Sequence, residues 1–213
     1  MTIPARRLGE QFQDLAKQDH AARLAMWVFL ASELLLFAAL FALYTSYRAM
    51  YPDDFALAAA HNNLALGTIN TFILITSSAT VALALWAVRG GQERLTSGLL
   101  IFSIGCGVLF LILKGVEYGQ HFRAGIYPGV GFHAAGLTGP GARLFFTLYY
   151  LITGLHALHV VAGLCVLGWL LSGSLRGHFG PEDHLRFELG TLYWHLVDVV
   201  WIFVWPLLYL LHR

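Results

Sequence analysis

The stretch YWHLVDVVWIFVWPLLY, from Tyr193 to Tyr209, decides the fold of this chain. It is apolar enough to cross a membrane, yet it carries an imidazole and a carboxylate, those of His195 and Asp198, near its middle. A charge near the centre of a bilayer disfavours insertion by about 2.5–3.5 kcal/mol, so such residues usually face the interior of a helix bundle. The stretch therefore predicts a membrane helix whose polar side chains face other helices.

The composition of the whole chain agrees with this interpretation. Of the 213 residues, 58% are hydrophobic and only 12% are charged, whereas soluble domains carry about 25% charged residues. A helical span needs ~20 mostly apolar residues, and several stretches of this chain meet that requirement. The formal net charge of +1 gives no electrostatic basis for binding nucleic acid. The composition predicts a multi-pass membrane protein.

Five apolar segments predict an all-α integral membrane bundle of five transmembrane helices. The segments cover residues 24–47, 64–88, 95–118, 142–171 and 187–211. Residues 1–23 are too polar for a signal peptide and are expected to form an N-terminal segment, followed by a single transmembrane domain over 24–213. A glycine-rich link over residues 119–141 joins the third and fourth segments.

The distribution of lysine and arginine predicts the orientation of the bundle. Eight of these residues lie on the side that holds the N-terminus: Arg6, Arg7, Lys17, Arg23, Arg89, Arg94, Arg176 and Arg186. Four lie on the other side: Arg48, Arg123, Arg143 and Arg213. Because positively charged residues accumulate on the cytoplasmic side of a membrane, we expect a cytoplasmic N-terminus.

Ionisable residues recur within the predicted spans at helical spacing. Three couples are each three residues apart: Lys114 and Glu117, His156 and His159, His195 and Asp198. This spacing places the two members of each couple on one face of a helix. The first span carries a further carboxylate, that of Glu33. We expect these side chains to form a buried polar network that ties the helices together.

Three functional interpretations compete with this structural one. The His156/His159 couple has ligand chemistry, but the Glu-x-x-His motif of four-helix di-iron proteins does not occur in the sequence. His159 and His195 could ligate a haem from facing spans, although nothing else in the sequence favours it. Glu33 could serve a transport path, but the sequence shows no internal repeat of the kind many transporters have.

Four stretches resemble subunit III of the haem–copper terminal oxidases, of cytochrome c oxidase in particular. They are MWVFLASELLLFAALFALY (Met26–Tyr44), LKGVEY (Leu113–Tyr118), GLHALHVVAG (Gly154–Gly163) and YWHLVDVVWIF (Tyr193–Phe203). The similarity runs in order along nearly the whole chain. The chain departs from the seven-span form of the family by lacking two spans, as many bacterial relatives do, and its link over residues 119–141 looks longer than usual.

The resemblance implies a non-catalytic subunit packed against the catalytic subunit I, in a bacterial cytoplasmic membrane. It implies no catalytic residue, metal, haem or copper in this chain, with haem and copper in the partner subunits and phospholipid bound to the bundle. Glu33 falls at the position of the family's buried, carbodiimide-reactive carboxylate, which makes it the candidate for supporting proton uptake. On the cytoplasmic side, Arg23, Arg94 and Arg186 are candidate partners for lipid phosphate, because guanidinium binds phosphate bidentately.

Two alternatives to a cytochrome c oxidase subunit remain open. Subunit III of a quinol oxidase, or a homologue associated with nitric oxide reductase, is the alternative within the superfamily; those relatives tend to carry Asp where this chain has Glu33. Ser32-Glu33 together with the string VDVV (197–200) favours the cytochrome c oxidase branch. A freestanding membrane transporter is the alternative of a different class.

Overall fold

The computed structural model describes residues 9–210, except 11, 128–131, 133–135 and 138. The described residues are helical apart from turns and links, in the order α1 (Leu15–Met50), α2 (Pro52–Ala59), α3 (Leu64–Arg89), α4 (Glu93–Arg123), α5 (Pro140–Leu175), α6 (Leu185–Trp205) and the π-helical turn η2 (Pro206–Leu210). The end of the predicted fifth span, at Leu211, lies outside the described residues, as do parts of the 1–23 segment and of the 119–141 link.

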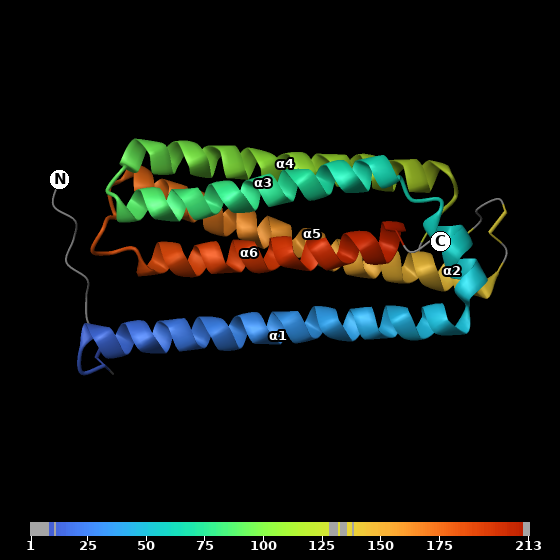
Figure 1. The fold of residues 1–213 in the computed structure, drawn as a ribbon, viewed down its shortest axis with the longest axis horizontal. Helices are drawn as coiled ribbons and strands as arrows, with labels where there is room; N and C mark the ends of the chain where they lie inside the picture. Colours follow the sequence, from blue (N-terminus) through green and yellow to red (C-terminus); the bar gives the residue numbers. More distant parts are fainter. Residues whose placement is uncertain (1–8, 11, 128–131, 133–135, 138, 211–213) are drawn as a thin grey trace.

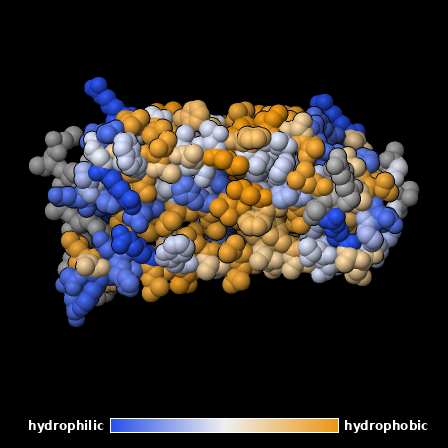
Figure 2. Space-filling model, viewed as in Figure 1, coloured by the Kyte–Doolittle hydropathy of each residue, from blue (hydrophilic) through white to orange (hydrophobic). Residues whose placement is uncertain are grey.

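The prediction of five transmembrane helices is confirmed. Helices α1, α3, α4, α5 and α6 with η2 are each long and apolar enough to cross a membrane. Helix α1 begins at Leu15 rather than at Leu24, because the Asp14 side chain caps it by accepting a hydrogen bond from the Lys17 amide. In Figure 2, hydrophobic residues fill the middle of the molecule and hydrophilic residues gather at both ends, as expected for a spanning bundle.

Helices α3, α4, α5 and α6 form one group, and α1 runs along its side (Figure 1). Glycines let these helices approach closely. A Cβ atom on Gly107 of α4 would lie 2.9 Å from the Trp194 ring, and one on Gly163 of α5 would lie 2.7 Å from it. The buried Trp194 of α6 therefore fits between two glycines on neighbouring helices, the close packing that small residues permit in membranes.

Two hydroxyl groups of α3 accept hydrogen bonds from the indoles of α6. Trp194 donates its Nε1 hydrogen to Ser77 Oγ at 3.1 Å, and Trp201 donates to Thr71 Oγ1 at 3.0 Å. All four side chains are buried, so each hydrogen bond satisfies an indole that water cannot reach. These bonds fix the register between the antiparallel helices α3 and α6.

The short helix α2 ties the end of α1 to the start of α5. Asp54 Oδ2 accepts a hydrogen bond from the Gly141 amide at 2.9 Å, in the first turn of α5. Beside it, Phe55 packs edge-to-face on the rings of Tyr44 and Phe145. A carboxylate at a helix N-terminus satisfies an amide that has no partner within the helix and interacts favourably with the helix dipole.

We expect Asp54→Ala to lower the stability of the folded bundle by about 1 kcal/mol, the typical effect of losing a side-chain cap. Asp53→Ala is the matched control, because Asp53 lies next to it on α2 and is exposed. Thermal unfolding of the two variants in lipid nanodiscs measures the difference. Equal melting temperatures for the two variants would contradict the capping role.

Candidate functional site

The most deeply buried charges lie between α4, α5 and η2. Lys114 Nζ donates to Glu117 Oε2 at 2.8 Å and to the Tyr149 hydroxyl at 2.9 Å, and also to the Tyr209 hydroxyl. Tyr209 in turn donates to Glu117, at 2.7 Å from Oε1. The ammonium group thus has three acceptors for its three hydrogens. We call these four residues the Lys114 cluster.

Aromatic rings enclose the Lys114 cluster. Lys114 Nζ lies 4.7 Å from the centroid of the Tyr149 ring and 5.2 Å from those of Trp201 and Tyr209. Side-chain exposure is 3% for Lys114 and 0% for Glu117. A buried ion pair is tolerated only when its remaining hydrogen-bonding capacity is met, as it is here for the ammonium group.

The π-helical turn η2 supplies Tyr209 to this cluster. Pro206 lacks an amide hydrogen and so cannot continue the α-helical bonding pattern of α6. Two carbonyls of the turn find partners on other elements: the Tyr44 hydroxyl donates to Leu207 O at 2.8 Å, and Asn62 Nδ2 donates to Leu208 O at 2.9 Å. The end of α6 is therefore held by α1, by the α2–α3 link and by the Lys114 cluster.

Glu33 of α1 meets His159 of α5. Glu33 Oε2 lies 2.9 Å from His159 Nε2, and His159 Nδ1 lies 2.8 Å from Leu155 O. A carbonyl can only accept, so Nδ1 donates to Leu155 O and Nε2 faces the Glu33 carboxyl group. The contact joins α1 to α5.

The other three ionisable residues of the predicted couples have different surroundings. His195 Nδ1 lies 2.7 Å from Ser78 Oγ of α3. Asp198, one turn further along α6, lies near the Ser78 hydroxyl, but neither of its oxygens has a hydrogen bond of acceptable geometry within the described residues. His156 is fully buried against the rings of Phe110 and Trp201. Among the three couples, only Lys114 and Glu117 are bonded to each other.

A cluster of opposite charges joins three helices at one end of the bundle. Arg23 of α1 and Arg89 of α3 each lie 3.5 Å from Glu188 Oε2 of α6, with about half of each arginine side chain exposed. Of the other predicted phosphate partners, Arg94 and Arg186 are exposed. The three residues Arg23, Arg89 and Glu188 are called the arginine end below.

An apolar groove of about 350 Å³ runs between α1 and α6. It is lined by Trp27, Leu30, Ala31, Leu34, Leu192, His195, Leu196 and Val199. The groove begins one helical turn from Arg23 on α1 and from Glu188 on α6. An apolar groove beside arginine side chains has the chemistry of a phospholipid site. The acyl tails would lie in the groove and the phosphate at the arginines.

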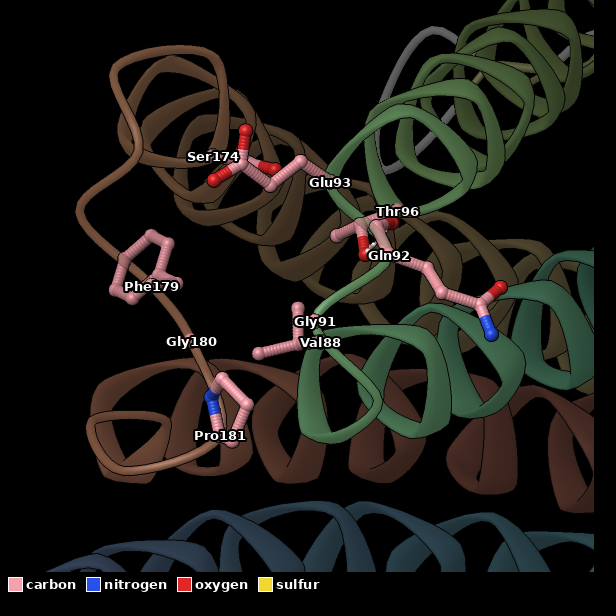
Figure 3. Close-up of a pocket in the computed structure, with 9 residues that line it drawn as sticks. All are labelled: Val88, Gly91, Gln92, Glu93, Thr96, Ser174, Phe179, Gly180 and Pro181. Carbon is pink, nitrogen blue, oxygen red and sulfur yellow. Dashed lines mark hydrogen bonds between the residues drawn. The ribbon is translucent and has the colours of Figure 1, made fainter. Parts of the chain in front are cut away.

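A second hollow, of about 180 Å³, lies between the α3–α4 turn and the α5–α6 link (Figure 3). The Glu93 carboxylate, the buried Thr96 and Ser174 side chains and the Phe179 ring line it. Glu93 stands in the first turn of α4, where the helix dipole stabilises a carboxylate, and Thr96 donates to Gln92 O. The start of α4 thus accounts for Glu93 and Thr96, and Ser174 Oγ lies 3.2 Å from Ser97 Oγ.

Several residues of these contacts were not predicted from the sequence. Tyr149 could have been found, because it lies seven residues before His156 and shares its helix face. Tyr209 could not, because the π-helical turn changes the spacing on which such an inference depends. No group of three His, Cys, Asp or Glu side chains within the described part of the chain could hold a metal ion.

Comparison with known proteins gives one consistent family. A family model described as cytochrome c oxidase subunit III matches residues 13–212. Cytochrome c oxidase subunit 3 of Thermostichus vulcanus is 32% identical over 191 residues, which are 89% of this chain and 87% of that protein. The protein of the same name from Synechocystis is 33% identical over 186 residues, 86% of this chain and 73% of that protein.

A third relative differs in its organisation. The heme-copper oxidase subunit I+III of Aeropyrum pernix is 32% identical over 197 residues, which are 88% of this chain but only 22% of that protein. The family match covers the five helices and every polar contact described above. This chain belongs to the cytochrome c oxidase subunit III family.

Proposed function

We propose that the chain is the non-catalytic subunit III of a proton-pumping cytochrome c oxidase in a bacterial cytoplasmic membrane. It binds alongside subunit I, whose haem and copper reduce oxygen, and it stabilises that subunit. The observation that carries this proposal is the family match over nearly the whole chain, supported by a relative named as a fused subunit I+III. The polar contacts agree, since they join helices of this chain to one another.

Helix α1 offers the surface for such a neighbour. It is the least buried of the five spans within this chain, and large apolar side chains such as Leu35, Val28 and Leu34 are exposed along it. Lipid and a second membrane subunit are the two surroundings in which such a surface is stable. The Glu33–His159 couple lies just behind it.

We propose that the Glu33–His159 couple supports proton uptake by subunit I and its durability during turnover. The side chains of Glu33 and His159 are 19% and 12% exposed, and the couple lies at the boundary between α1 and the remaining helices. With the orientation predicted from the charge distribution, Glu33 falls in the cytoplasmic half of the apolar segment 24–47, where uptake begins.

Glu33→Gln should leave assembly intact but reduce turnover, or shorten the time for which the enzyme stays active. The amide can donate to His159 Nε2 in the same place, so the shape of the contact is kept while the exchangeable carboxyl proton is lost. The loss should be partial, because the redox chemistry takes place in the partner. Oxygen consumption and proton pumping over successive turnovers measure the effect.

Glu182→Gln, on the exposed α5–α6 link, is the matched control and should behave like the wild type. An assembled Glu33→Gln enzyme with wild-type activity, pumping and active lifetime would rule out the proton role.

We further propose that the groove between α1 and α6 holds a phospholipid whose phosphate lies at the arginine end. Arg23 and Arg89 share a single carboxylate, that of Glu188, so the cluster carries an excess positive charge beside an apolar groove. Arg94 and Arg186 are exposed near the same end of the bundle and remain candidates for additional headgroup contacts.

Replacing both arginines, as Arg23→Gln with Arg89→Gln, should lower the number of phospholipids that stay bound through purification. Phosphate analysis and native mass spectrometry of the purified complex measure this number. Arg176→Gln, an exposed arginine on the α5–α6 link, is the control and should retain the wild-type lipid content. Unchanged lipid content in the double variant would argue against the arginine end as a headgroup site.

A further inference from the structure

Three polar side chains in the bundle interior have no hydrogen-bond partner among the described residues. They are Asn70 of α3 and His156 of α5, both 0% exposed, and Asp198 of α6, which is 2% exposed. In each residue both polar side-chain atoms are unpartnered. Six buried polar atoms on three different helices thus lack a hydrogen-bond partner.

These side chains lie close to the same level of the bundle, around Trp201. The Trp201 indole donates to Thr71, the neighbour of Asn70 in the chain. The His156 ring lies 5.0 Å from the Trp201 ring, between their centroids. Asp198 precedes Trp201 by three residues, or just under one helical turn. Helices α3, α5 and α6 therefore each carry one unpartnered side chain near the level of Trp201.

Groups outside the chain cannot satisfy these atoms. Their side chains are buried by the chain itself, so neither lipid nor a neighbouring subunit reaches them. A buried polar group without a partner destabilises a protein, because its hydrogen bonds to water are lost and not replaced. Buried water molecules, each making about three hydrogen bonds to such groups, are the usual remedy in proteins.

We propose that Asn70, His156 and Asp198 form an internal hydration site, which binds ordered water in the interior of the bundle. Amide, imidazole and carboxyl groups offer both donors and acceptors, so water can bridge all three helices. The site lies between two features already described. Ser78 lies near Asp198 and bonds to His195 at the groove, and the Trp201 ring lies close to both His156 and Lys114 Nζ.

The same chain holds an equally buried region without such groups, which serves as an internal comparison. Phe55 and Phe145 are 1% and 0% exposed and pack edge-to-face on each other and on Tyr44. Both regions are closed to bulk solvent. They differ in the polarity of what surrounds the rings, so of these two regions the one near Trp201 is expected to bind water.

X-ray radiolysis in H₂¹⁸O tests the proposal, because hydroxyl radicals formed from bound water oxidise the side chains next to it. The chain is irradiated in native membranes, together with any subunits bound to it there. The labelling is read from this chain alone, so the test does not depend on which subunits those are. Mass spectrometry should find ¹⁸O on Trp201 and His156 and only background on Phe55 and Phe145. Background labelling at all four residues would overturn the proposal.

The variant Asn70→Leu gives a second test at similar side-chain volume. Removing the amide should displace water from the site, so labelling of Trp201 and His156 should fall toward that of Phe55. Labelling that stays at the wild-type level would overturn the assignment of Asn70 to the site. Thr68→Val, at a partly exposed position of α3 two residues earlier, is the control and should leave the labelling unchanged.

Discussion

An amine buried between membrane helices is the constraint on which the arrangement of the chain depends. Lys114 cannot reach water, so its three hydrogens need acceptors from the protein, and Glu117, Tyr149 and Tyr209 supply them. Bringing Tyr209 into place requires the π-helical turn after Pro206, whose carbonyls then need donors from Tyr44 and Asn62. One buried charge thus links α1, α4, α5 and η2.

The remaining polar contacts also pair buried or partly buried polar groups of different helices, at other levels of the bundle. Trp194 and Trp201 bond to hydroxyls of α3, Glu33 bonds to His159, and the arginine end joins α1, α3 and α6. All of these contacts join helices of this chain to one another.

Much of the fold could be predicted from the sequence, because hydropathy and length alone mark a membrane helix. Spacing also predicted that Lys114 and Glu117 share a face. Spacing could not predict the contacts between helices. The contacts of His159 with Glu33 and of His195 with Ser78 depend on which helices are neighbours and on how each helix is rotated. The contact of Tyr209 could not be predicted, because the helix changes from α to π at Pro206 and the spacing changes with it.

The most direct measurement is to purify the tagged chain from its native membranes under mild conditions and to record its absorbance spectrum. We expect the chain to copurify with larger, haem-bearing subunits and to be colourless once separated from them. A chain that purifies without any haem-bearing partner would contradict it. So would a separated chain that retains a Soret band or a stoichiometric redox metal.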